Sequence, residues 1–161
     1  CASVFGLRRS VRVPSVWSNP GLAWAINITA TERRSPAKAK VLVVDDSSLV
    51  RLYYRSALEI AGFEVKQAIN GIEAMEKVLS ESFDLVIVDV NMPRMDGFTF
   101  LRSLRSGAAD VATLPALMIS TEAGEQDMAE ARVAGANFYL VKPVAEAELV
   151  RHVCVLTGVA L

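Results

Sequence analysis

The chain is poor in cysteine, with only two in 161 residues. Cys1 and Cys154 lie at opposite ends of the sequence, so they form neither a metal-binding nor a redox spacing. Cys154 stands in an apolar run, which predicts a buried thiol in a reducing compartment. The cysteine content therefore gives no support to a thiolate metal site or a disulfide framework.

Long hydrophobic runs are also missing. No stretch approaches the roughly 20 apolar residues that are needed to cross a bilayer. Arg8-Arg9 has the form of a twin-arginine export signal, but Pro14, Asn19 and Pro20 interrupt the segment that follows. We therefore expect no membrane insertion and a cytoplasmic location.

A basic surface is absent from most of the chain. Residues 38–161 carry 12 Lys and Arg against 17 Asp and Glu, whereas residues 1–37 carry five Arg and one Glu. Nucleic-acid binding needs a basic face that releases counterions, so the acidic body predicts no nucleic-acid partner. Residues 1–37 also lack a sustained hydrophobic period, and we expect an ill-defined, flexible extension before a single domain at 38–161.

From Lys40 onward, the chain alternates short apolar runs with amphipathic segments. Continuous apolar runs are typical of parallel strands that are buried on both faces. The expected strands are 41–44, 63–68, 85–88, 117–119 and 138–141, and the expected helices begin at Ser47 or Ser48, Asn70-Gly71, Phe98, Glu125 and Ala145, with a loop at 107–113. Five strands alternating with five helices predict right-handed crossovers and a doubly wound parallel α/β sheet.

The apolar residues of the first two predicted helices also indicate which face of each helix is buried. Apolar residues that recur every three or four positions mark the side of a helix that faces the core. The predicted buried residues are Leu49, Tyr53, Ala57 and Ile60 in the first helix and Ile72, Met75, Val78 and Leu79 in the second.

Polar residues stand where four of the predicted strands end. They are Asp45-Asp46, Asp89, Ser120 and Lys142-Pro143. Because the carboxyl ends of parallel strands share one edge of the sheet, three acids, a hydroxyl and an ammonium should converge there. Such a cluster indicates a site for a divalent cation and a phosphoryl group.

The chemistry of these groups supports that interpretation. Three crowded carboxylates repel unless a cation is bound, and oxygen ligands suit Mg²⁺. Asp89 is the candidate nucleophile, because a carboxylate can attack phosphorus to give an aspartyl phosphate. Taken singly, Asp46 and Ser120 also fit helix caps, and Lys142 fits a solvated turn. The isomer of the Lys142-Pro143 bond stays open.

Four segments resemble the receiver domain of two-component response regulators. They are Val-Val-Asp-Asp-Ser at 43–47, Asp-Val-Asn-Met-Pro-Arg-Met-Asp-Gly at 89–97, Pro-Ala-Leu-Met-Ile-Ser at 115–120 and Gly-Ala-Asn-Phe-Tyr-Leu-Val-Lys-Pro at 135–143. The resemblance covers residues 38–161. It implies the flavodoxin-like, CheY-like fold with strand order 2-1-3-4-5 and a reversible signalling role.

The resemblance also assigns roles to residues. Asp89 would accept a phosphoryl group from a sensor histidine kinase or a His phosphotransfer protein. Asp46, Asp89 and the main-chain carbonyl of Asn91 would bind Mg²⁺ directly, and Asp45 would hold it through water. Ser120 and Lys142 would contact the phosphoryl oxygens.

Further roles concern the output of the domain. Tyr139 matches an aromatic switch position, and Asn91 and Glu122 match positions that tune hydrolysis. Thr121 stands where a smaller residue is usual. A downstream protein would dock on the face formed by residues 122–157. Because the chain ends soon after its last helix, we expect a single-domain regulator without an enzymatic or DNA-binding output domain.

Two other functions compete with this one. A Mg²⁺-dependent phosphohydrolase of the haloacid dehalogenase type also uses an Asp nucleophile, but it usually places a second acid two residues later, where this chain has Asn91. A receiver-like interaction domain that works without phosphorylation is the other alternative. The complete set of acids and Lys142 argues against it.

Overall fold

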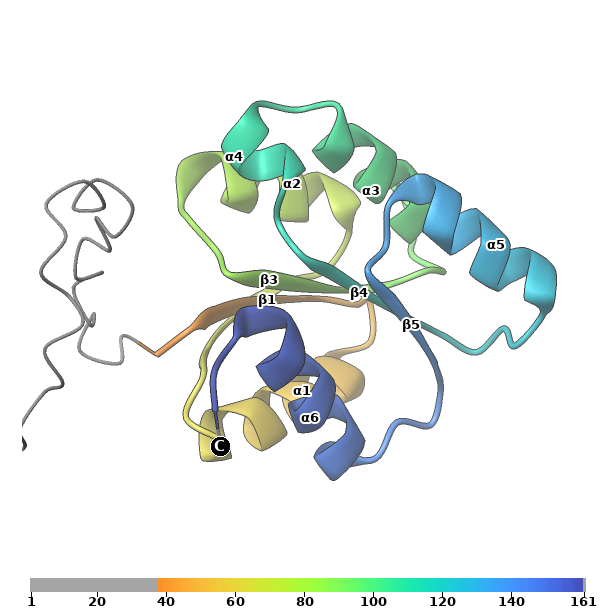
Figure 1. Ribbon diagram of the computed structural model, residues 1–161. Coiled ribbons are helices and arrows are strands. Elements are labelled where there is room, and N and C mark those ends of the chain that lie inside the picture. The colour runs from red at the N-terminus through yellow and green to blue at the C-terminus, as the bar shows by residue number, and fades with distance from the viewer. Residues whose placement is uncertain (1–37, 161) are drawn as a thin grey trace, which may run out of the picture. The chain divides into compact units, whose positions relative to one another are not determined.

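Parallel strands and helices alternate through residues 38–160, the part of the chain that the computed structural model describes (Figure 1). The expected extension at 1–37 lies outside the described residues. The strands are β1 (Lys40–Val44), β2 (Glu64–Ala68), β3 (Leu85–Asp89), β4 (Ala116–Ser120) and β5 (Phe138–Val141). The helices are α1 (Ser48–Ile60), α2 (Gly71–Ser80), α3 (Gly97–Arg105), α4 (Ala109–Ala112), α5 (Glu125–Ala134) and α6 (Glu146–Thr157).

The five strands form one parallel sheet in the order β2-β1-β3-β4-β5, which confirms the predicted topology. The sheet register aligns Val44 with Val88, and Asp89 with Ile119. The ends of β1, β3 and β4 therefore lie at the same edge. This register is what brings the strand-end polar residues together.

Each face of the sheet has its own hydrophobic core. On one face, side chains of β1, β3 and β4 such as Leu42 and Val86 pack with α2, α3 and α5. On the other face, alternating side chains such as Val43 and Ile87 pack with α1 and α6. Figure 1 shows the same two layers of helices, and Cys154 lies buried in the second core as expected.

The predicted buried faces of α1 and α2 were partly wrong. Leu49 and Ile60 are 77% and 86% exposed, and Tyr53 is exposed as well. Helix α1 buries Ala57, as predicted, together with Tyr54 and Leu58. In α2, the buried residues are Gly71, Ala74 and Val78, while Ile72 and Leu79 are exposed. Both helices have apolar residues on more than one side. Which side faces the sheet depends on how the helix packs against the strands.

A sixth, four-residue helix occupies the segment that was expected to be a loop. In α4, the carbonyl of Ala108 accepts hydrogen bonds from the amides of Val111 and Ala112. A single turn of helix carries almost no periodic signal, which is why the sequence prediction missed it. No helix within 38–160 has the length and apolar character that a membrane crossing requires.

Arg105 at the end of α3 has an unpredicted structural role. Its guanidinium donates hydrogen bonds to the carbonyls of Ala112, Leu114 and Gly135, at 2.7–3.0 Å. Burial lowers the pKa of Arg105 from its usual value. These bonds tie the end of α3 to the end of α4, to the loop before β4 and to the loop before β5, at the edge of the sheet that lies opposite the polar cluster.

Candidate functional site

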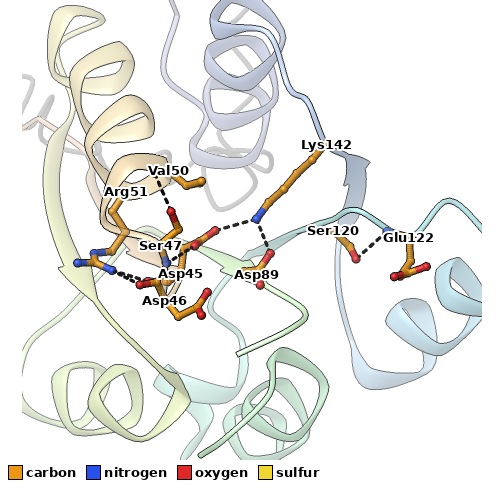
Figure 2. A network of polar contacts seen from close by, with 9 residues as sticks. All are labelled: Asp45, Asp46, Ser47, Val50, Arg51, Asp89, Ser120, Glu122 and Lys142. Carbon is orange, nitrogen blue, oxygen red and sulfur yellow. Dashed lines mark hydrogen bonds and ion pairs between the residues drawn. The ribbon is translucent and has the colours of Figure 1, made fainter. Parts of the chain in front are cut away.

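Lys142 stands between two buried carboxylates at the carboxyl edge of the sheet (Figure 2). Its Nζ lies 2.6 Å from Oδ1 of Asp89 and 2.9 Å from Oδ2 of Asp45. Asp45 and Asp89 are 2% and 7% exposed, so neither acid is a solvated loop residue. Lys142 follows β5, and its peptide bond to Pro143 is cis. The alternative of an ordinary solvated turn lysine is therefore wrong.

The loop after β1 is held by hydrogen bonds on both sides of Asp45. The amide of Asp45 donates to the carbonyl of Ala68 in β2, at 3.2 Å, and Oδ1 of Asp45 accepts from the amide of Ser47, at 2.8 Å. The cap of α1 is Ser47, whose Oγ accepts from the amide of Val50. Asp46 is therefore not the helix cap, and its side chain is exposed beside the site.

The donor set fits a hard cation such as Mg²⁺, although the acids do not form a closed cage. Within residues 38–160, no three His, Cys, Asp or Glu side chains are grouped closely enough to hold a metal. Lys142 takes up the space between Asp45 and Asp89, and Asp46 is exposed. Mg²⁺ binds few protein carboxylates and keeps several waters, so two or three oxygen donors at an open edge suit it.

The titration behaviour of the site follows from burial and close charges. Burial raises the pKa of Asp89, the hydrogen bond from Lys142 lowers it, and the charges of Asp45 and Asp46 raise it again, so that the pKa lies above its usual 3.8. Burial lowers the pKa of Lys142, but its bonds to the two acids outweigh this and raise it. Tyr54 below the site has its pKa raised to about 12 by burial.

Ser120 and Tyr139 meet at one peptide segment. Ser120 is fully buried, and its Oγ accepts a hydrogen bond from the amide of Glu122, at 3.1 Å. The hydroxyl of Tyr139 donates to the carbonyl of Glu122, at 2.9 Å. Ser120 does not cap a helix, because α5 begins only at Glu125. Glu122 therefore connects the two side chains through its main chain, while its own side chain is exposed.

The loop after Asp89 is fixed by its backbone. The amide of Val90 donates a hydrogen bond to the carbonyl of Ile119, at 3.3 Å, and the carbonyl of Val90 accepts one from the amide of Gly97, at 2.9 Å. Asn91 is exposed next to these bonds, and Asp96 caps α3 by accepting from the amide of Thr99. A Cβ placed on Gly97 would lie 2.3 Å from the carbonyl oxygen of Asp89. The sequence motif contained this glycine, but its spacing did not reveal the close approach.

Arg51 of α1 is a further residue beside the site that the sequence prediction missed. Its Nη1 donates to the carbonyl oxygens of Asp45 and Asp46, at 2.7 and 3.1 Å. A side chain that binds main-chain carbonyls cannot be recognised from a residue pattern, because every residue has a carbonyl group. The only available signal was its position one helical turn after Ser47.

Asp89→Asn is expected to increase the free energy of unfolding at pH 7 in metal-free buffer, by about 0.5–2 kcal/mol. The raised pKa of Asp89 means that the folded state binds its proton more tightly than the unfolded state does. Stability is therefore lost as the pH rises above 3.8, and the amide removes this loss. Urea unfolding of both proteins at several pH values measures it. A variant less stable than the wild type at pH 7 would contradict the expectation.

Comparison with known proteins places this arrangement in a family. The family described as "Response regulator receiver domain" matches residues 41–154. The chain is 40% identical over 114 residues to the transcriptional regulatory protein PrrA of Mycobacterium leprae, covering 71% of this chain and 48% of PrrA. It is 38% identical over 112 residues to a gliding motility regulatory protein of Myxococcus xanthus, covering 70% of this chain and 14% of that protein. The chain thus spans half or less of these relatives.

Solved structures agree with the sequence relatives. The chemotaxis protein CheY4 of Vibrio cholerae superposes with a TM-score of 0.71 at 38% identity, over 74% of this chain and 99% of that one. The receiver domain of a histidine kinase from Syntrophus aciditrophicus gives a TM-score of 0.70 at 29% identity, over 74% of this chain and 90% of that one. The chain therefore belongs to the response regulator receiver domains of two-component signalling and has their CheY-like fold.

Proposed function

We propose that this domain accepts a phosphoryl group on Asp89 from a phosphohistidine donor, in a reaction that requires Mg²⁺. The donor would be a sensor histidine kinase or a His phosphotransfer protein. A carboxylate oxygen of Asp89 attacks phosphorus as the bond from phosphorus to the histidine nitrogen breaks, and that nitrogen keeps the bonding electron pair. The products are an aspartyl phosphate and a neutral histidine after proton uptake.

The observation that carries this proposal is the contact of Lys142 with Asp89 at the open edge of the sheet. An ammonium already 2.6 Å from the acceptor carboxylate is placed to pair with phosphoryl oxygens as negative charge arrives. Asp46, Asp89 and the main-chain carbonyl of Asn91 would hold Mg²⁺ directly, and Asp45 would hold it through water. The ion would then neutralise charge on the transferring group. Ser120 offers a hydroxyl on the neighbouring strand.

The output would be a change of the surface formed by α5, β5 and α6. A groove of about 350 Å³ is lined by Met128, Ala131, Arg132, Ala136, Asn137, Phe138 and Tyr139. Tyr139 lines this groove and is bonded to the segment that holds Ser120, so a shift of Ser120 toward a phosphoryl group would change the groove. We propose that a downstream protein docks here and responds to that change.

Labelling experiments test the acceptor. With phosphorylated candidate kinases and Mg²⁺, the wild type should gain one label that base and hydroxylamine remove, as expected of an acyl phosphate, and Asp89→Asn should gain none. Asp110→Asn, at an exposed acid of α4, is the matched control and should label normally. Undiminished labelling of Asp89→Asn would refute Asp89 as the acceptor.

Two further outcomes separate this function from its alternatives. Steady release of phosphate from a phosphomonoester, without accumulation of label, would indicate a phosphohydrolase. Absence of label with every donor, together with unchanged partner binding, would indicate an interaction domain that works without phosphorylation. That the domain works alone, without an output domain, stays a prediction, and the domain content of the protein isolated from its own cells tests it.

A further inference from the structure

Arg51 holds the main chain on both sides of Asp46. Its Nη1 donates to the carbonyl oxygen of Asp45, at 2.7 Å, and to that of Asp46, at 3.1 Å. The first carbonyl belongs to the peptide plane that precedes the Cα atom of Asp46, and the second to the plane that follows it. Figure 2 shows the guanidinium beside these two carbonyls. One side-chain nitrogen therefore restrains both peptide planes that determine where the Asp46 side chain points.

The guanidinium is itself held in place. Its Nε donates to Oε1 of Gln67 in β2, at 3.1 Å, so that the side chain bridges α1, the loop after β1 and the neighbouring strand. The planar fork of an arginine can make these bonds at once, while the single ammonium of a lysine lacks the second group at a fixed angle. Arg51 is half-buried, which also limits its freedom.

Asp46 needs such support more than Asp45 does. The Asp45 carboxylate is fixed by the amide of Ser47 and by Lys142, at 2.8 and 2.9 Å. The Asp46 side chain is exposed, so its direction depends on the backbone that carries it. A ligand held only by its backbone loses metal affinity when that backbone is free to turn.

We propose that Arg51 is a positioning residue that orients Asp46 for the divalent cation. This inference rests on the proposed Mg²⁺-dependent function. It assigns to Arg51 a favourable effect on Mg²⁺ binding, although its positive charge alone would repel the ion. Positioning raises the affinity for Mg²⁺ and charge repulsion lowers it. We expect positioning to be the larger effect, because Nη1 bonds to both carbonyls that flank Asp46.

The test is a titration of the full chain with MgCl₂, followed through the amide NMR shifts of residues 44–48. Arg51→Met should raise the Mg²⁺ dissociation constant about 10-fold, as is typical when a group supporting a metal ligand is removed. Arg51→Lys keeps the charge but loses the fork, and should also bind more weakly than the wild type. Gln67→Leu frees the guanidinium and should weaken binding in the same direction.

Arg55→Met is the matched control. Arg55 lies one helical turn further along α1 and, among residues 38–160, forms its ion pair with Glu59, exposed and at 2.8 Å. Its removal should leave the dissociation constant unchanged. An Arg51→Met constant equal to that of the wild type, or lower, would overturn the inference. If that variant does not fold, Arg51→Lys decides, and wild-type affinity in it would overturn the positioning role.

The same titration separates failure of this inference from failure of the function on which it rests. If the wild type shows no Mg²⁺-dependent shifts up to millimolar concentrations, the proposed Mg²⁺ requirement is wrong and the inference fails with it. If the wild type binds and the Arg51 variants bind equally well, only the positioning role is wrong.

Discussion

Lys142→Met is expected to lower the free energy of unfolding by about 3–5 kcal/mol at pH 7 in metal-free buffer. The Asp45 and Asp89 side chains are 3% and 8% exposed, and the ammonium lies within 2.9 Å of both. Methionine fills similar volume but leaves two buried carboxylates facing each other without a cation. Urea unfolding measures the deficit.

The pH dependence of this deficit identifies its cause. Protonating a carboxyl removes one of the repelling charges, so the deficit should shrink as the pH falls toward 4. Adding Asp89→Asn to Lys142→Met should also recover part of the lost stability, because the remaining carboxylate no longer faces a second one. Lys66→Met, at an exposed lysine of β2, is the control and should change stability little. A pH-independent deficit would show that lost packing, rather than charge, is responsible.

Gly97→Ala is expected to reduce the rate of phosphorylation of Asp89 by about 100-fold or more. The added Cβ would lie 2.3 Å from the carbonyl oxygen of Asp89 and 3.1 Å from the Cα of Val90, and both are backbone atoms that cannot rotate away. Either α3 or the end of β3 must move, and a shift of β3 displaces the carboxylate of Asp89, the proposed acceptor. Labelling time courses measure the rate, and urea unfolding should show a cost of about 1–3 kcal/mol.

Gly71→Ala is the matched control for this substitution. Gly71 is the first residue of α2, as Gly97 is of α3, and an added Cβ would also be crowded, at 2.6 Å from Cγ of Met95. Here the neighbour is a flexible side chain that can change its rotamer. We expect labelling of Gly71→Ala within a few-fold of the wild type. Equal labelling rates of the Gly97 and Gly71 variants would contradict the argument.

The sequence was sufficient to predict the sheet and the acids at its edge. Continuous apolar runs identify buried parallel strands, and parallel strands necessarily end on one side, so Asp45, Asp89, Ser120 and Lys142 could be grouped without coordinates. The family resemblance then supplied the strand order, which the sheet confirms. This prediction succeeded because it depended on topology, which the order of elements nearly determines.

The features that could not be predicted depend on packing direction and on backbone contacts. Leu49 and Ile60 have the apolar character of core residues, yet the side of α1 that carries Tyr54 and Leu58 faces the sheet. Arg51 binds carbonyl groups, which every residue has, so no sequence pattern indicates this contact. Such contacts form only when the chain is folded and its elements are packed together.

The main chain of Glu122 couples two parts of the domain, so that an effect at either part should also be felt at the other. Its amide donates to Ser120 and its carbonyl accepts from Tyr139, so the proposed phosphoryl site and the proposed docking groove share one short segment. Linkage requires that two ligands coupled through one equilibrium affect each other by the same factor. A protein that binds the groove beside Tyr139 more tightly after phosphorylation must shift the phosphorylation equilibrium of Asp89 equally. The receiver of the signal then also acts as an effector of the acceptor site.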